Sequence, residues 1–240
     1  MAEQNPARSS EVISEQPLVV TLDGPAGSGK TTVARMVADR LGIAYLDSGA
    51  MFRAFALGLG AQSWTWSEDV LGDRLVGLKF ALQGRGGEAA LLLNGEPLGE
   101  KIRREEVGMW ASNLAKVGVV REILKQAQQR LGAGTSLVAE GRDMGSVVFP
   151  QARYKFFLDA APEERARRRW LQLKEMGVDE DLDALIANLR QRDDQDRNRA
   201  IAPLKPADDA VIIDTAGLTP GQVVERIVEI MSPNLIHPSG

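Results

Sequence analysis

The sequence contains no cysteine and a single histidine, His237, among its 240 residues. Without cysteine the chain forms neither disulfides nor thiolate metal sites, a composition that suits a reducing compartment. His237 lies in a proline-containing stretch near the end of the chain, and we interpret it as a solvated residue. Disulfide scaffolds, histidine-based triads and cysteine–histidine metal clusters are therefore excluded, and we expect a cytoplasmic protein.

Long apolar runs are also missing. No stretch approaches the roughly 18 apolar residues that a membrane span needs, so we expect no membrane partner. Residues 1–16 are polar and lack the apolar centre of a secretory signal, which predicts a flexible N-terminal tail. The formal net charge of −4 argues against broad nucleic-acid binding, and we expect no nucleic-acid partner.

One strong motif stands against these absences: residues 24–31 read G-x-x-x-x-G-K-T. An apolar, β-branched run at 18–23 precedes it, and a helical pattern from Val33 to Leu41 follows it. This order of strand, loop and helix is what separates a phosphate-binding P-loop from a chance glycine turn. Backbone amides of such a loop close around an anion, with the positive end of the helix dipole behind them. The sequence therefore predicts binding of a nucleoside triphosphate.

The P-loop assigns roles to its residues. Lys30 is expected to reach the β- and γ-phosphates of the nucleoside triphosphate, and the Thr31 hydroxyl to bind Mg²⁺. The full predicted ATP-phosphate site is Gly24, Pro25, Ala26, Gly27, Ser28, Gly29, Lys30, Thr31 and Thr32.

The remaining chain alternates between strand and helix patterns. Further apolar strands are predicted at 43–46, 137–139, 154–159 and 210–214. Helical patterns occur at 50–59, 102–114, 119–131 and 182–189, and helices are predicted to begin at Pro162 and Pro220, the latter with a capping box from Thr219 to Gln222. Five strands interleaved with helices predict an α/β fold whose parallel sheet is covered on both faces.

A different texture interrupts this alternation. Short extended pieces at 75–82, 89–93 and 97–98, with Asn94-Gly95 between apolar runs, predict a small inserted antiparallel sheet. Residues 63–73 before it are interpreted as a polar connection.

Arginines and acidic residues follow the predicted strand ends, where ligands bind such a sheet. Asp47-Ser48 ends one strand, with Ser48 as a candidate helix N-cap and Arg53 on the helix that follows. Residues 140–143 end another strand with Arg142 and Asp143. These groups therefore face the same edge as the P-loop.

A charge run at 190–199 adds to them. Helical spacings of four and three place Arg192, Asp196 and Arg199 on one face if the helix continues that far. Taken alone, the run would be a solvated surface with pairs such as Asp193–Arg197. Beside a P-loop it predicts a second phosphorylated ligand, because guanidinium groups grip phosphate oxygens bidentately.

A second arginine cluster is harder to interpret. Four arginines in five positions cannot share one helical face, so at least some of them are expected to be solvated. They are Arg165, Arg167, Arg168 and Arg169.

With these residues in view, the chain resembles the bacterial cytidylate kinases (CMP/dCMP kinases) of the nucleoside monophosphate (NMP) kinase family. The motifs that carry the resemblance lie at 23–30, 46–50, 140–150 and 192–199, and it spans roughly 17–231. The resemblance implies a P-loop kinase with a five-stranded parallel sheet flanked by helices, a small β-containing NMP-binding insert at 61–114 and a helical lid at 161–200. The core would comprise 17–60, 115–160 and 201–232, with a tail at 233–240.

The implied reaction transfers the γ-phosphoryl group of ATP to CMP or dCMP with Mg²⁺. Carried over by motif, Ser48, Arg53, Arg142 and Arg192 would bind the CMP phosphate, Asp196 a ribose hydroxyl, and Ser112, Arg121, Asp143 and Arg199 the base. Lys30, Arg142, Arg192 and Arg199 would be the catalytic residues. A carboxylate such as Asp143 accepts from the cytosine amino group and is repelled by the oxygen of uracil.

Two positions depart from the family pattern. Phe52 stands where tyrosine is expected, and Glu140 where aspartate is expected.

Two alternative functions remain. A kinase for another acceptor such as UMP or AMP is one alternative, and a P-loop switch or interaction module is the other. The arginine constellation, which would have no purpose in a switch, argues against that second alternative. We expect a monomer, since no apolar stripe is left over.

Overall fold

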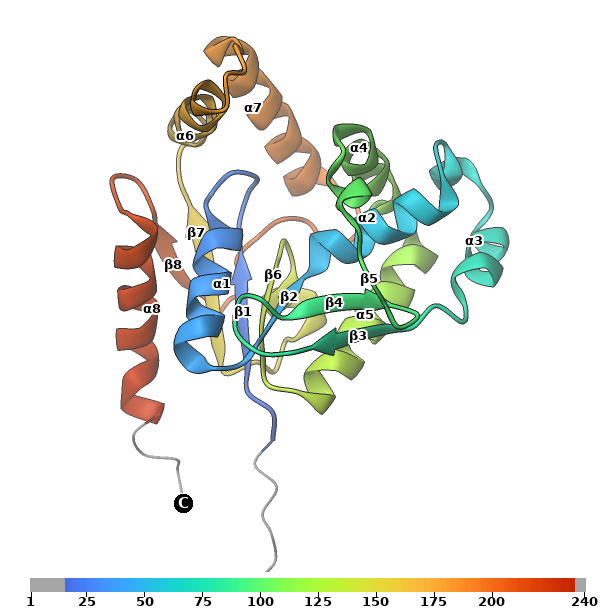
Figure 1. The fold of residues 1–240 in the computed structure, drawn as a ribbon, viewed down its shortest axis with the longest axis horizontal. Coiled ribbons are helices and arrows are strands. Elements are labelled where there is room, and N and C mark those ends of the chain that lie inside the picture. Colours follow the sequence, from blue (N-terminus) through green and yellow to red (C-terminus); the bar gives the residue numbers. More distant parts are fainter. Residues whose placement is uncertain (1–15, 236–240) are drawn as a thin grey trace, which may run out of the picture.

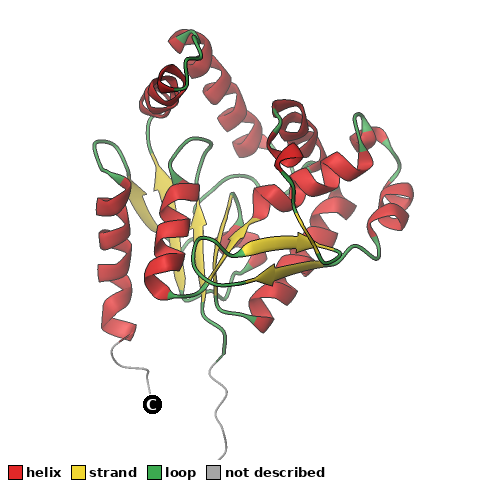
Figure 2. Cartoon of the chain, in the orientation of Figure 1, coloured by secondary structure: helices red, strands yellow, loops and turns green. Residues whose placement is uncertain are grey.

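A five-stranded parallel sheet forms the centre of the structure (Figure 1, and yellow in Figure 2). The structure is a computed structural model that describes residues 16–235, so the predictions for 1–15 and for His237 lie outside the described residues. The strand order is β2-β6-β1-β7-β8, which confirms the predicted fold class. The bounds are β1 Val19–Asp23, β2 Ala44–Asp47, β6 Leu137–Gly141, β7 Tyr154–Asp159 and β8 Val211–Asp214.

Helices cover both faces of this sheet because alternate strand residues point to opposite sides. Val138 packs in one apolar cluster with α1 (Lys30–Leu41) and α8 (Pro220–Leu235). Its neighbours Leu137 and Ala139 pack in the other cluster with α2 (Ser48–Leu59) and α5 (Gly118–Gly134). None of the helices in the described part of the chain is long and apolar enough to cross a membrane.

Helix starts follow local capping chemistry. The predicted box at α8 forms, since Gln222 N donates to Thr219 Oγ1 at 3.3 Å and Thr219 N to Gln222 Oε1 at 2.9 Å. Ser48 is not the N-cap of α2: the Asp47 carboxylate accepts from Ala50 N at 2.9 Å instead, and Ser48 Oγ donates to the Glu140 carbonyl at 2.7 Å. The Ser48 hydroxyl is thus tied to the end of β6.

The inserted sheet consists of β3 (Phe80–Gln83), β4 (Ala90–Leu93) and β5 (Glu96–Pro97), all antiparallel. The Asn-Gly turn forms as predicted, with Asn94 and Gly95 both at positive φ.

The predictions for 63–73 and for the start of β3 are wrong. A short 3-10 helix, η1 (Ser63–Thr65), and α3 (Glu68–Leu75) occupy this region, and the first strand begins only at Phe80. Ser67 caps α3, and Leu71 and Leu75, four residues apart, are buried together against the core. The polar composition of the segment conceals this two-residue apolar stripe.

The remaining helices surround the carboxyl ends of the strands. A 3-10 turn, η2 (Glu100–Arg103), leads into α4 (Glu105–Leu114), which packs on α2. A π-helical turn, η3 (Met144–Val148), follows β6, and α6 (Pro162–Glu175) with α7 (Leu182–Asn198) forms a hairpin beyond the strand ends (Figure 1).

Two details of α7 differ from the prediction. The helix ends at Asn198, and Arg199 has extended backbone (φ −66°, ψ 140°), so the three predicted residues do not share one helical face. Asp193 does not pair with Arg197; it is buried and bonds Arg165 of α6. Of the arginine cluster, Arg167 is exposed as expected, whereas Arg165 is buried.

Candidate active site

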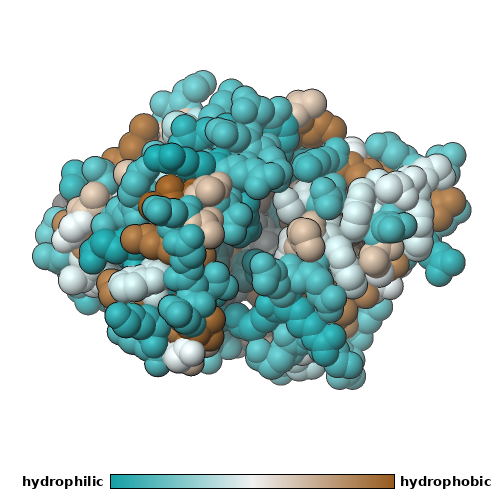
Figure 3. Space-filling model, turned by 90° about the horizontal axis from the view of Figure 1, so that it is seen from above, coloured by the Kyte–Doolittle hydropathy of each residue, from teal (hydrophilic) through white to brown (hydrophobic). Residues whose placement is uncertain are grey.

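A cleft of about 320 Å³ opens at the carboxyl ends of the strands, between the P-loop, α2, α4, β6 and α7. Viewed from above, the molecule is hollowed near its middle, between two lobes that both carry hydrophilic and hydrophobic residues (Figure 3). The cleft size is that of a small-molecule site. All nine residues predicted to bind the acceptor nucleotide line it: Ser48, Arg53, Ser112, Arg121, Arg142, Asp143, Arg192, Asp196 and Arg199.

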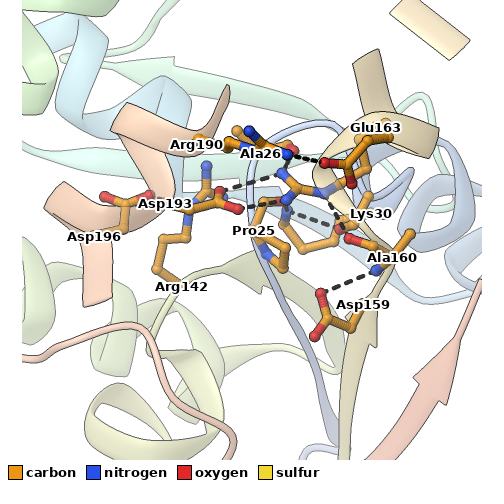
Figure 4. Close-up of polar contacts among 12 residues, drawn as sticks. Pro25, Ala26, Lys30, Arg142, Asp159, Ala160, Glu163, Arg190, Asp193 and Asp196 are labelled. Carbon is orange, nitrogen blue, oxygen red and sulfur yellow. Dashed lines mark hydrogen bonds and ion pairs between the residues drawn. The ribbon is translucent and has the colours of Figure 1, made fainter. Parts of the chain in front are cut away.

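The P-loop forms one wall of this cleft. Gly27 and Gly29 adopt positive φ (77° and 87°), which the tight turn requires. Lys30 is buried, and its Nζ donates to the Pro25 carbonyl at 2.6 Å and to Ser28 Oγ at 3.3 Å (Figure 4). Burial, together with the nearby positive charge of Arg142, lowers the pKa of Lys30 to about 7. The ammonium group is thus held in a loop that lacks an anionic partner of its own.

Gly24 and Pro25, the first two residues of the predicted phosphate site, have structural roles. Gly24 lies so close to β7 that a Cβ would stand 2.1 Å from the Leu158 carbonyl oxygen. Pro25 offers its carbonyl to Lys30. The cleft itself, with a neighbouring cavity, is lined by the rest of the loop: Ala26, Gly27, Ser28, Gly29, Lys30, Thr31 and Thr32.

The arginines of the cleft divide into paired and unpaired groups. Arg142 Nε lies 2.8 Å from Asp196 Oδ2 (Figure 4). Arg53 and Arg192, by contrast, have no hydrogen bond or ion pair with any residue that the structure describes. They face the cleft from α2 and α7 beside Lys30. Unpaired cations that converge on one space favour a dianionic or more highly charged ligand there.

At the other end of the cleft, one carboxylate lies between two arginines. Asp143 Oδ2 bonds Arg121 Nη2, and its Oδ1 lies 3.5 Å from Arg199 Nη2. All three side chains are largely buried. Arg199 Nη2 has no hydrogen-bond partner in the structure, so one buried donor is left for a ligand. Asp143 and Arg199 together thus offer a carboxylate and a free donor to a ligand in the cleft.

Asp23 supports this end of the cleft, a role that the sequence did not reveal. Its carboxylate accepts from Met144 N at 2.9 Å and Gly145 N at 2.8 Å, which fixes the chain just after Arg142 and Asp143. Burial raises the pKa of Asp23 to about 6 despite these two bonds. Its position as the last residue of β1, beside β6, was the only available signal.

Two hydroxyl groups and a carboxylate lie together where the P-loop helix begins. Thr31 Oγ1 donates to Glu140 Oε2 at 3.0 Å, and Tyr45 donates its hydroxyl to Glu140 Oε1. Burial and the nearby Asp47 carboxylate raise the pKa of Glu140. The described residues contain no cluster of three or more potential metal-ligating side chains. A hydroxyl and a carboxylate suit Mg²⁺, which takes few protein ligands and completes its shell with water and phosphate oxygens.

A second cavity, of about 610 Å³, lies on the other side of the P-loop against α6 and the start of α8. Its apolar patches come from Val33, Leu189, Leu218 and Val223. Arg168 and Arg169 line it as well, and Arg168 Nη1 donates to Thr215 Oγ1 at 3.2 Å. Sequence reasoning missed this cavity because its walls come from four separate segments without a shared motif.

Comparison with known proteins agrees with this geometry. The sequence profile of the family described as "Cytidylate kinase" matches residues 20–233. A cytidylate kinase of Nitratidesulfovibrio vulgaris (Hildenborough) is 62% identical over 200 residues, which are 83% of this chain and 86% of that protein. One of Maridesulfovibrio salexigens is 56% identical over 89% of this chain and 96% of that protein, and one of Vibrio cholerae 44% identical over 91% and 97%. The chain therefore belongs to the cytidylate kinase family.

Proposed function

We propose that the protein transfers the γ-phosphoryl group of ATP to CMP or dCMP, giving ADP and CDP or dCDP. One observation carries the proposal: the cleft beside the P-loop holds the unpaired Arg53 and Arg192 at one end and the Asp143–Arg199 pair at the other. The first end suits a phosphate and the second a cytosine edge.

The reaction needs no protein nucleophile, because a CMP phosphate oxygen attacks the γ-phosphorus and is already anionic near neutral pH. The protein's contribution is positioning and charge stabilisation along an in-line path. In this proposal Arg53, Arg142 and Arg192 hold the acceptor phosphate with Ser48. Lys30 stabilises negative charge on the transferred group and on the departing ADP.

The base and sugar would be read at the other end. Asp143 accepts from the cytosine N4 amino group, Arg199 donates to the ring edge, and Ser112 and Arg121 complete the pocket wall. Asp196 would accept a hydrogen bond from a ribose hydroxyl, either in place of its bond from Arg142 or in addition to it.

Mg²⁺ fits the site beside the P-loop. Thr31 and Glu140 would hold it, together with phosphate oxygens of ATP. When bound, the ion neutralises charge on the β- and γ-phosphates. The P-loop motif assigns the Thr31 hydroxyl to the metal. The side chain of Glu140, which is longer than the aspartate expected at this position, already contacts that hydroxyl.

The elements around the cleft would serve as a mobile lid at 161–200 and an NMP-binding insert at 61–114. The α6–α7 hairpin carries Arg192 and Asp196, and α4 carries Ser112. Movement of both toward the sheet would exclude water and limit ATP hydrolysis.

A coupled ADP-release assay tests the proposal, with ATP·Mg²⁺ and, separately, CMP, dCMP, UMP, AMP or no acceptor. We expect strong turnover with CMP and dCMP, weak turnover with UMP and none without acceptor. Equal rates with every acceptor would contradict the base-reading roles. Slow ATP hydrolysis that ignores the acceptor would indicate a nucleotide switch instead.

A further inference from the structure

A buried arginine of the lid helix contacts the P-loop. Arg165 on α6 is only 1% exposed, although Arg167 and Arg169 of the same run are exposed. Its Nη1 donates to the Ala26 carbonyl at 2.7 Å, and its Nε to the Ala160 carbonyl at 2.8 Å. A buried charge is costly unless it is paired and hydrogen-bonded. The full set of partners therefore marks a specific contact rather than a chance approach.

The countercharge comes from the next helix. Asp193 of α7 accepts from Arg165 Nη1 at 3.2 Å and also from its Nη2, and it too is buried. Ala26, Ala160 and Asp193, which Figure 4 labels, all accept hydrogen bonds from this one guanidinium group. Asp193 directly follows Arg192 in the sequence. A single side chain thus links the P-loop, the start of α6 and the helix that carries acceptor-site residues.

The linked carbonyl belongs to a peptide that can turn over. Gly27 has a φ of 77°, and glycine adopts positive and negative φ with similar ease. The described chain contains no cis peptide bond, and the C=O and the following N–H of a trans peptide point in opposite directions. With the Ala26 carbonyl directed at Arg165, the Gly27 amide is directed to the opposite side of the loop. The bond from Arg165 therefore stabilises one of two orientations of this amide.

We propose that Arg165 and Asp193 are positioning residues of the donor site. Arg165 holds the Ala26–Gly27 peptide with its amide toward the nucleotide phosphates, and Asp193 holds Arg165. Because Asp193 lies on α7, the orientation of the phosphate-binding amide depends on the placement of the lid hairpin. The inference rests on the proposed ATP site at the P-loop and assigns two residues to which no role was given above.

The first test replaces the pair by apolar residues of similar volume, Arg165→Met with Asp193→Leu. Such replacements of buried ion pairs often leave stability near native, whereas removal of one partner does not. Titration calorimetry would measure binding of ADP·Mg²⁺ and, separately, of CMP. We expect ADP binding to weaken at least tenfold, CMP binding to change less than threefold, and the melting temperature to stay close to that of the native protein. Arg167→Met, which alters an exposed arginine of the same helix, should change none of these.

A second variant, Asp193→Asn, separates positioning from direct phosphate binding by Arg165. It removes the countercharge and keeps the shape. If Arg165 only positions the loop, ADP binding weakens; if Arg165 itself binds phosphate, its release from Asp193 makes ADP binding tighter, which would overturn the inference. ADP binding at native strength in both variants would also overturn it. Failure of the native protein to bind ADP would instead overturn the proposed function.

Discussion

At the scale of single residues, the proposed preference for cytosine depends on Asp143. Its carboxylate is bonded by Arg121 and faces Arg199, so its position in the cleft is fixed. An ionised carboxylate accepts hydrogen bonds and donates none. In the proposed function, Asp143 would therefore discriminate an amino group from a carbonyl oxygen at the same ring position.

We predict that Asp143→Asn lowers kcat/KM for CMP by about 10- to 100-fold, as expected for loss of a hydrogen bond to a charged group. Turnover of UMP should fall less or rise, because the new amide can donate to the uracil oxygen. Steady-state kinetics with both acceptors measure the ratio. The exposed Asp194→Asn serves as control and should leave it unchanged. An unaltered CMP preference in Asp143→Asn would assign base recognition elsewhere.

The lowered pKa of Lys30 predicts that ATP binding is coupled to uptake of a proton. Because its pKa is lowered to about 7, the side chain is protonated below pH 7 and largely neutral at pH 8 in the free protein. A bound triphosphate favours the charged form and raises that pKa. ATP binding at pH 8 should therefore take up a proton, and affinity should fall as the pH rises above 7.

The uptake is measured by titration calorimetry at pH 8 in two buffers of different ionisation enthalpy. Lys30→Arg is the matched variant, since arginine stays charged and has no proton to take up. We expect uptake in the native protein and none at this site in the variant. Equal uptake by both proteins would show that Lys30 is already charged in the free state.

At the scale of elements, the P-loop is constrained by packing as well as by phosphate. Gly24 and Gly29 both have positive φ, but only at Gly24 would a Cβ collide with backbone, at Leu158 of β7; at Gly29 nothing lies within 4 Å. Substitution of Gly29 therefore introduces backbone strain alone, whereas substitution of Gly24 also introduces a steric clash.

We predict that Gly29→Ala lowers the free energy of unfolding by about 1–2 kcal/mol, the cost of a left-handed alanine. Gly24→Ala should cost more than twice as much, because β1 and β7 must move apart. Thermal unfolding of both variants measures the difference. Similar melting temperatures would mean that the end of β7 yields easily.

The elements were predictable where one local pattern dominates, and not elsewhere. Strand, loop and helix around the P-loop could be predicted because hydrophobic periodicity and a spaced motif agree. The α3 helix could not be predicted, since its apolar stripe consists only of Leu71 and Leu75 within a polar segment. Arg165 and Asp193 lie 28 residues apart, and no spacing rule connects them. Their burial depends on how two helices pack, which is a tertiary effect.

At the scale of the whole molecule, arginines from three separate elements converge on the cleft and repel one another. Burial lowers the pKa of Arg192 on α7, and the nearby charges of Arg142 after β6 and Arg53 on α2 lower it further. A bound phosphate between them cancels that repulsion. The lid hairpin and the acceptor side of the cleft should therefore come together only when anions fill the space.

We predict that CMP together with a non-hydrolysable ATP analogue slows amide hydrogen exchange in α4 and α7 more than either ligand alone. Exchange in β1 and β6 should change little, because these strands are paired on both sides and packed in both cores. Mass spectrometry of peptides from these elements measures the protection. Arg192→Ala should remove the excess protection of α7, since the repulsion and its cancellation both depend on that guanidinium. If α7 is protected equally by CMP alone, the acceptor phosphate suffices to bring it in, and the donor phosphates have no part in the closure.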